Sequence, residues 1–257
     1  MSNRWHRRTT FPTRCCRLHL LFAASSLFFI ASLSPAAFAQ SVSGVPGLVR
    51  VPIATFHDDG TLLIGSSFLP REHLPYTGNQ RDAIAAYAGL TFLSFIEVDL
   101  RVTRQLGVAE GADHVVDRVP TVRVRILPEK KWIPAIALGF HDVLTSIESG
   151  EAHHFGATYL VATKHFDIPW GLLRAGVTAG WGADRLIWDN SEFTGPFGGL
   201  SLSTGHLPWL SLLADYDGAT VNAALRASLF KRLDITAGTI GFDSFTATLS
   251  YRFRLIR

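Results

Sequence analysis

Apolar and polar residues alternate one by one along several segments of the chain, and this period of two constrains the fold most. In residues 96–103, four aliphatic side chains alternate with Glu97, Asp99, Arg101 and Thr103. Successive side chains of a β-strand point to opposite faces, so the pattern predicts strands with one apolar and one polar face. The same alternation occurs in residues 121–126, 220–229 and 245–253.

Turn-forming residues separate about twelve such segments. No segment after residue 39 has the ~18 consecutive apolar residues of a membrane-spanning helix. An even number of antiparallel strands of ~9–11 residues is typical of barrels in bacterial outer membranes. We therefore predict an all-β, antiparallel transmembrane β-barrel of about 12 strands over residues 61–257. The expected strands are 61–68, 83–92, 94–105, 119–127, 133–143, 155–165, 170–180, 195–204, 207–217, 219–229, 232–240 and 244–254.

Two features favour a membrane barrel over a soluble β-sandwich. The outer face of a sandwich usually carries many lysines, whereas residues 40–257 contain only Lys130, Lys131, Lys164 and Lys231. Aromatic residues gather near the predicted turns, where outer-membrane barrels place interfacial girdles. These aromatic residues are Phe68, Tyr76, Trp132, Phe140, Phe166, Trp170, Trp181, Trp188, Trp209, Tyr216, Phe230, Phe242, Tyr251 and Phe253.

Residues 1–39 have the composition of a secretory signal peptide. They contain five arginines and no acidic residue, followed by an apolar run over 20–33 and the small-x-small triplet 37–39. This order predicts cleavage after Ala39. Residues 40–60 would then form an N-terminal lead-in or plug before the barrel. Both cysteines, Cys15 and Cys16, lie in the leader, so we expect no disulfide or thiolate metal site in the exported chain.

The leader also accounts for the basic character of the sequence. The formal net charge is +3 for the full chain and becomes −2 when the five leader arginines are removed. A nucleic-acid-binding protein needs a basic stripe on its folded surface, so the composition argues against a nucleic-acid partner.

Charged residues on the polar faces are the candidate functional residues. A charge facing lipid at the bilayer midplane costs ~2–4 kcal/mol for Arg or Lys, so these side chains should face the lumen. They could pair with one another and stabilise the wall, or, for Arg123, Arg125, Glu97 and Asp215, line a path for sugar hydroxyls or uronate groups. The candidate lumen-lining residues are Glu97, Asp99, Arg101, Arg123, Arg125, Lys164, Asp215 and Arg226.

The sequence lacks the usual signatures of catalysis. Nucleophile-elbow, P-loop, H-E-x-x-H and G-x-G-x-x-G motifs are absent. Adjacent His153 and His154 would point to opposite faces of a strand, so we expect no metal site there. Because the cofactor-binding motifs are absent, we also expect no cofactor. His141-Asp142 is interpreted as a polar loop mouth. Ser203 and His206 leave open an alternative, a lipid-modifying enzyme embedded in the barrel, although no acid completes a triad.

Several short motifs, in order along the chain, resemble the YjbH-like family of outer-membrane proteins associated with exopolysaccharide. The match begins with Gly44-Val45-Pro46-Gly47-Leu48 and Asp59-Gly60-Thr61-Leu62. It continues through residues 123–129, 134–142, 159–164, 180–182, 195–199 and 214–217. Members of this family are generally longer and often lipid-anchored, whereas this sequence has no cysteine after its apolar run.

The resemblance implies a non-enzymatic barrel in the bacterial outer membrane that takes part in production, assembly or export of an extracellular polysaccharide. The expected partners are outer-membrane lipid, the polysaccharide and periplasmic exopolysaccharide-assembly proteins. The family offers no catalytic residues to transfer. A soluble periplasmic β-protein remains the third alternative. A filled lumen would indicate a scaffold or docking protein, and an open lumen a conduit.

Overall fold

The computed structural model describes residues 40–76, 81–107, 116–143, 154–168, 173–183 and 192–255, all within one compact unit. The leader, with its cleavage site after Ala39, lies outside the described residues, as do His153, Trp170 and Trp188. No described helix is long and apolar enough to cross a membrane.

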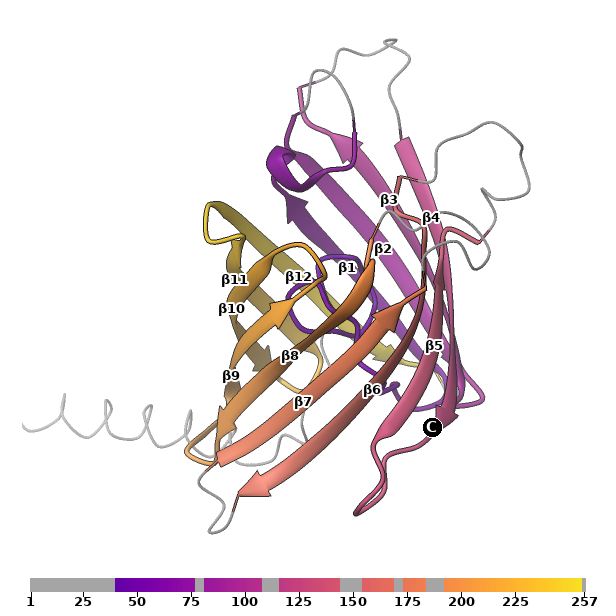
Figure 1. Cartoon of the computed structure of the whole chain (residues 1–257), viewed down its shortest axis with the longest axis vertical. Helices are drawn as coiled ribbons and strands as arrows, with labels where there is room; N and C mark the ends of the chain where they lie inside the picture. The colour runs from indigo at the N-terminus through magenta and orange to yellow at the C-terminus, as the bar shows by residue number, and fades with distance from the viewer. Residues whose placement is uncertain are drawn as a thin grey trace, which may run out of the picture. The chain divides into compact units, whose positions relative to one another are not determined.

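The strands form a single closed antiparallel barrel in which each strand pairs with its neighbours in sequence and β1 pairs with β12 (Figure 1). This confirms the predicted fold class, because all twelve predicted strands are present with end shifts of a few residues. A single 3-10 turn, η1 (Arg71–His73), follows β1. The strands are β1 Thr61–Leu69, β2 Ala83–Phe92, β3 Ile96–Gln105, β4 Val116–Leu127, β5 Ala135–His141, β6 Ala157–Ile168, β7 Leu173–Gly182, β8 Gly195–Thr204, β9 Leu207–Tyr216, β10 Val221–Leu229, β11 Leu233–Ile240 and β12 Ser244–Arg254.

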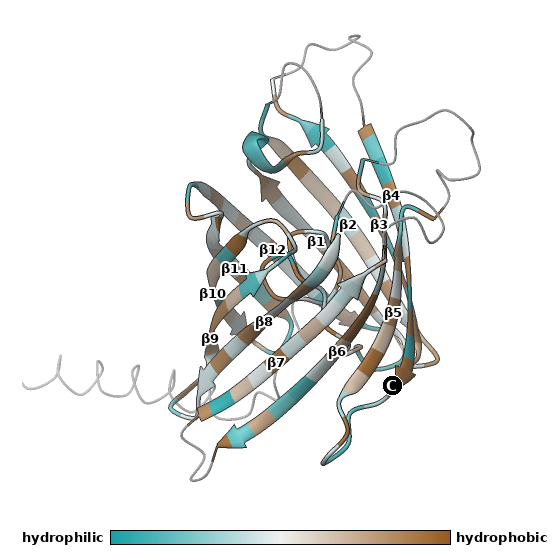
Figure 2. Ribbon diagram, in the orientation of Figure 1, coloured by the Kyte–Doolittle hydropathy of each residue, from teal (hydrophilic) through white to brown (hydrophobic). Residues whose placement is uncertain are grey.

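The apolar face of the strands points outward and the polar face points inward. On β3, Glu97, Asp99 and Arg101 are at most 4% exposed, whereas Val98 and Leu100 are 49% and 48% exposed. The same reversal of ordinary burial occurs on β10 and β12, and Figure 2 shows brown and teal residues alternating along the strands. A soluble sandwich would hide its apolar face, so this arrangement matches a barrel whose outer wall contacts hydrocarbon.

Exposed aromatic residues form two groups at opposite ends of the barrel wall. Phe92, Phe95, Trp132, Phe166, Phe230 and Phe253 lie at the end where β1 begins, and Trp181, Tyr216, Phe242 and Phe245 lie at the other end. Phe245 and Phe253 share the outward face of β12. Their eight-residue separation spans ~27 Å along the strand. Because strands of such barrels tilt by ~40° from the barrel axis, this corresponds to roughly 20 Å along the axis. This height is close to the ~25 Å apolar band of outer-membrane barrels.

The prediction that Tyr76 belongs to the interfacial aromatic girdle is wrong. Tyr76 is only 7% exposed, and its hydroxyl group donates a hydrogen bond to Asp117 at 3.3 Å. Its ring also makes an edge contact with Phe155. Proximity to a turn does not determine whether a loop residue folds back over the mouth, so the sequence pattern could not distinguish Tyr76 from the girdle residues.

The connections at the two ends of the barrel differ in length. At the end where β1 begins and β12 finishes, the longest connection, residues 128–134, has seven residues. At the opposite end, residues 70–82, 106–115, 142–156 and 183–194 form four connections of ten to fifteen residues, and residues 217–220 and 241–243 form two short turns. We call these the short-turn end and the long-loop end. Outer-membrane barrels have the same asymmetry, with short turns in the periplasm and long loops outside the cell.

Large rings that point inward lie over glycines on the neighbouring strand. Gly139 pairs with Tyr159 across β5 and β6, and a Cβ atom on Gly139 would lie 2.1 Å from the Tyr159 ring. Gly65 and Tyr87 make the same arrangement across β1 and β2. The missing glycine side chains therefore allow bulky rings to lie flat against the inner wall.

We expect Gly139→Ala to displace the Tyr159 ring and destabilise the barrel by ~1–3 kcal/mol, the usual cost of overpacking. Urea titration of the protein folded into lipid vesicles measures this change. Ala162→Val is the matched control, because it adds bulk to the half-exposed outer face of β6. Equal unfolding midpoints for the Gly139 variant and the native protein would contradict the close ring packing.

Candidate functional site: the lumen and its plug

Residues 40–60, here called the plug, fold inside the ring of strands before the chain enters β1 (Figure 1). The plug forms no regular element; two isolated bridges, Gln40 with Pro46 and Gly47 with Pro52, hold it in a compact loop. Almost all its residues are buried, and Asp58 is its exposed residue. The lumen is therefore occupied by the chain's own N-terminal segment.

The apolar side chains of the plug pack against small side chains of the barrel wall. Val49, Val51 and Ala54 are 0% exposed. The surrounding cluster includes alanines on β2, β5 and β6, which leave room for a second layer of chain inside the barrel. These wall residues are Ala83, Ala85, Ala135, Ala137 and Ala157.

A single carboxylate on β9 anchors the centre of the plug. The backbone N–H groups of Val49, Arg50 and Val51 donate to Asp215 Oδ2 at 2.7, 2.9 and 3.1 Å. The other oxygen, Oδ1, accepts a hydrogen bond from Asn222 at 2.8 Å. Hydrogen bonds to a charged acceptor are stronger than neutral ones, and three converging amides compensate much of the cost of burying the carboxylate.

Two buried arginines bind backbone carbonyl groups of the plug. Arg226 donates from Nη2 to the carbonyl groups of Gly47 at 2.8 Å and Leu48 at 2.9 Å. Arg123 donates to the carbonyl group of Ile53 and pairs with Glu97 on β3. The plug has no regular hydrogen-bond ladder, so these side chains satisfy backbone groups that would otherwise be buried without partners.

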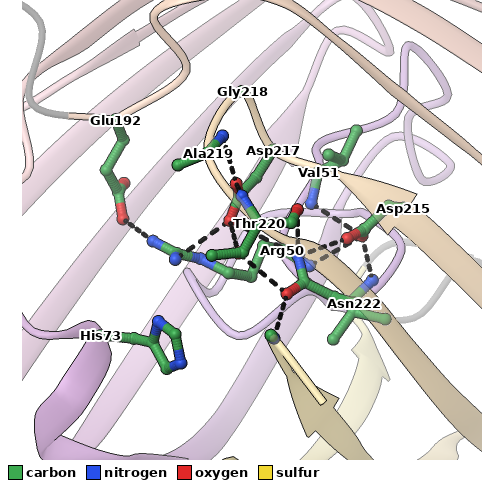
Figure 3. A network of polar contacts seen from close by, with 12 residues as sticks. Arg50, Val51, His73, Glu192, Asp215, Asp217, Gly218, Ala219, Thr220 and Asn222 are labelled. Carbon is green, nitrogen blue, oxygen red and sulfur yellow. Dashed lines mark hydrogen bonds and ion pairs between the residues drawn. The ribbon is translucent and has the colours of Figure 1, made fainter. Parts of the chain in front are cut away.

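Arg50 extends from the plug towards the long-loop end, where it meets two carboxylates (Figure 3). Its guanidinium group lies 3.3 Å from Glu192 and 3.0 Å from Asp217. Burial by itself would raise the pKa of Glu192, but the neighbouring His141 ring and the charges of Arg101 and Arg50 outweigh it and lower the pKa to about 2. Burial likewise opposes ionisation of Asp217, but the charge of Arg50 and hydrogen bonds from the adjacent turn hold its pKa below the ordinary value.

Seven of the eight candidate lumen residues lie on the inward face. Asp99 is buried beside Gly89, and Arg101 lies 4.0 Å from the centre of the Phe155 ring. Arg125 lies 5.5 Å from the ring centre of the plug residue Phe56. The other four inward-facing candidates, which contact the plug or support such a contact, are Glu97, Arg123, Asp215 and Arg226.

The prediction that Lys164 lines the lumen is wrong. Lys164 alternates with the buried residues of β6 and shares the outward face with Leu160 and Phe166. Its Nζ group donates to Glu129 at 2.7 Å and to the Lys130 carbonyl group at 2.9 Å. Near the end of a strand a long side chain can reach polar groups of a neighbouring turn, so the penalty for a lipid-facing charge does not force it inward.

The sequence interpretation missed several residues that bind or support the plug. Thr163 accepts a hydrogen bond from the Ala54 amide at 2.9 Å, and Glu192 lies in a connection that no periodicity marks. The useful signal was Arg50, a single charge within an otherwise apolar stretch from Val45 to Phe56. A lone charge in such a segment requires a partner once the segment is buried.

The remaining chemical candidates lie in different parts of the barrel, and His141 lies beside Glu192, the partner of Arg50. His141 ends β5, is 1% exposed and has its Nε2 atom 3.2 Å from the Tyr159 hydroxyl group. Ser203 lies inside the barrel near the short-turn end, whereas His206 is exposed in the β8–β9 turn. Among the described residues, no three His, Cys, Asp or Glu side chains converge as a metal site would require.

Cavities lie on both sides of the plug. The larger, of about 60 Å³, opens between β6 and β10 towards the short-turn end, and Gly47, Leu48 and Ile53 of the plug form one of its walls. The smaller, of about 10 Å³, lies beside Arg50 and Glu192 towards the long-loop end. The plug thus separates two small spaces inside the barrel, each lined by both polar and apolar residues.

We expect Asp215→Ala to loosen the plug, because three buried amides lose their acceptor at a cost of ~1–3 kcal/mol for each unsatisfied group. Hydrogen exchange of amides 49–51 in detergent micelles should accelerate by about tenfold or more. Asp243→Ala, which removes an exposed carboxylate that pairs with His73, is the control. Unchanged exchange in the Asp215 variant would contradict the anchoring role.

Acid should weaken the contact between Arg50 and the long-loop end. Because the pKa of Glu192 is lowered on folding, its stabilisation is complete above the ordinary value of 4.5 and is lost as pH falls from there towards about 2. Protease accessibility of the plug, followed with an acid-active protease from pH 6 to pH 2, should increase across this window. Glu192→Gln should show greater accessibility already at pH 6 and a flatter profile; a profile as steep as that of the native protein would contradict the assignment.

Comparison with known proteins places this architecture in a family. The chain is 26% identical over 246 residues to the uncharacterized lipoprotein YjbH of Escherichia coli (strain K12), with 80% of this chain and 32% of that protein covered. The chain therefore spans about a third of the length of that relative. A structural match to a KdgM porin covers 76% of this chain and 99% of the porin, with a TM-score of 0.45 and 11% identity. A family model described as exopolysaccharide biosynthesis protein YbjH matches residues 39–211, and the chain belongs to this YjbH family.

Proposed function

We propose that the protein is a non-enzymatic barrel of the bacterial outer membrane that serves exopolysaccharide production or export as a plugged docking protein. The observation that carries this proposal is the combination of an apolar outer wall with a lumen filled by the plug. The link to exopolysaccharide comes from the family, whose description names that process. Its proposed partners are outer-membrane lipid, the polysaccharide and periplasmic assembly proteins.

The wall of the barrel supports the membrane assignment. Outward positions on β10 and β12 carry Leu225, Phe245 and Leu249 at 54%, 59% and 51% exposure. Exposed apolar residues arranged continuously around a closed sheet are unfavourable in water and favourable in hydrocarbon. Closure of β1 on β12 also leaves no unpaired strand edge, which a lipid environment requires.

The packing of the lumen favours docking over free conduction. Plug residues with zero exposure have no solvent-filled gap beside them, so an extended sugar chain cannot pass between the plug and the wall around Val49 and Val51. The short-turn end, which we assign to the periplasm, exposes the larger cavity. This end is where a polymer or an assembly protein arriving from the periplasm would first contact the barrel.

Deletion of the gene in a producing strain tests the proposed role. We expect reduced extracellular polysaccharide, restored by the native gene, and recovery of the protein with outer membranes as a heat-modifiable band. Purified protein in planar bilayers should show little conductance, because the plug fills the lumen. Unchanged polysaccharide after deletion would contradict the role, and recovery in osmotic-shock fluid would contradict the membrane location.

Leu225→Arg should impair insertion of the barrel. Leu225 lies near the middle of β10 on the outer face, where an arginine facing hydrocarbon costs ~2–4 kcal/mol. The folded fraction in lipid vesicles, measured by heat-modifiable migration over a urea series, reports this cost. Leu255→Arg, just after β12, places the same charge near the interface and should cost only ~0–1 kcal/mol. Equal folding of both variants would contradict the lipid-facing position of Leu225.

A further inference from the structure

The larger cavity, here called the mouth cavity, has an unusual balance of charge. Its ionisable lining residues are His165 on β6, Arg174 on β7 and Arg226 on β10, and no Asp or Glu of the described residues lines it. Six hydroxyl groups complete the polar lining: those of Thr163, Thr178, Ser201, Ser203, Ser211 and Ser228. A basic, hydroxyl-rich surface favours a ligand that carries negative charge and several oxygen atoms.

The strand register aligns the most important of these residues. Arg174 pairs with Ser203, Ser203 pairs with Ser211, and Ser211 pairs with Arg226. The four residues thus form one row across β7 to β10, with an arginine at each end and two serines between them. At a strand spacing of ~4.8 Å the row is roughly 14 Å long, and it extends from the buried Arg226 to the partly exposed Arg174.

Space above the row comes from a glycine on β7. Gly176 pairs with Ser201, and a Cβ atom on Gly176 would lie 2.4 Å from Ser201 Oγ and 3.3 Å from His165 Nε2. The absence of a side chain at this position leaves room for the serine hydroxyl group and the histidine ring edge at the cavity wall.

The groups in the row differ in how firmly the protein holds them. Arg226 binds the plug carbonyl groups, so it is a fixed charge at the inner end of the row. Arg174 is 41% exposed and meets the largely exposed Asp167 at 3.4 Å, a surface pair that contributes little to stability. Ser203 and Ser211 make no hydrogen bond to protein within the described part of the chain. Arg174, Ser203 and Ser211 can therefore reorient towards a ligand at small cost.

A carboxylate behind the cavity holds the histidine in place. Glu129 Oε2 lies 2.7 Å from His165 Nδ1, and Glu129 Oε1 accepts a hydrogen bond from the His165 amide at 2.8 Å. The opposite edge of the ring, which carries Nε2, lies beside Gly176. His165 is therefore a fixed part of the cavity wall beside the row of arginines and serines.

We propose that the mouth cavity is a binding site for acidic sugar units, in which Arg174 and Arg226 attract the carboxylate groups and the serines of the row bind the sugar hydroxyls. The proposal rests on the proposed function and specifies the class of glycan that the barrel contacts. It moves the expected uronate contact away from Arg123, Arg125, Glu97 and Asp215, because none of these four residues lines the mouth cavity. The site faces the short-turn end and is accessible while the plug stays in place.

Calorimetric titration of the full-length protein in detergent micelles with an oligosaccharide of glucuronic acid tests this site. We expect saturable binding that weakens as salt increases, with much weaker binding of a glucose oligosaccharide of the same length. Arg174→Gln should weaken binding of the acidic oligosaccharide by about tenfold or more, and Ser203→Ala by a smaller factor. Arg118→Gln, an exposed arginine near the long-loop end, is the matched control and should bind as the native protein does.

The outcomes separate this site from the proposed function. Inorganic phosphate competing as well as the acidic oligosaccharide would identify a general anion site and overturn the sugar assignment. Absence of binding, or equal binding by the Arg174 and Arg118 variants, would overturn the site even if gene deletion still reduces extracellular polysaccharide. Heat-modifiable migration of each variant establishes that it is folded, so a loss of binding by Arg174→Gln in folded protein reports on the cavity.

Discussion

The outward orientation of the apolar strand faces is the constraint on which the rest of the structure depends. Once those faces contact hydrocarbon, the charged residues that alternate with the apolar ones in the middle of the strands face the inside of a closed barrel. Buried charges are tolerated only when they are paired or hydrogen-bonded. The plug supplies many of these partners: its amides bind Asp215, its carbonyl groups bind Arg123 and Arg226, and Arg50 pairs with loop carboxylates.

These hydrogen bonds and ion pairs between the plug and the wall explain why an irregular segment can occupy the centre of a barrel. A loop has no internal ladder, so it needs side chains that bind its backbone groups. The wall charges in turn need groups that offset their desolvation. The alanines of β2, β5 and β6 provide the space, and the valines of the plug add apolar contact that a purely polar lumen would lack. The result is a filled lumen with a small cavity on either side of the plug.

The mouth cavity differs from the plug contacts in what its residues do. Asp215 and Arg123 are committed to holding the chain itself, whereas the row from Arg174 to Arg226 combines one fixed arginine with groups that can reorient. The inner face of the barrel thus carries residues that fix the plug and residues that line the mouth cavity, and Arg226 belongs to both groups. This division distinguishes structural from ligand-binding charges on strands whose sequences look alike.

The sequence by itself determined the strands, their number and the face of most of their residues, because a period of two is a local property and a lipid-facing charge is costly. It did not determine the position of Lys164 or Tyr76, since a residue near a strand end or in a loop can contact a neighbouring turn or fold over the mouth. Only the tertiary structure decided that Asp215 binds the amides of residues 49–51 and that Arg174, Ser203, Ser211 and Arg226 form one row. These contacts join positions far apart in the chain, and they depend on barrel closure and strand register, which no local pattern specifies.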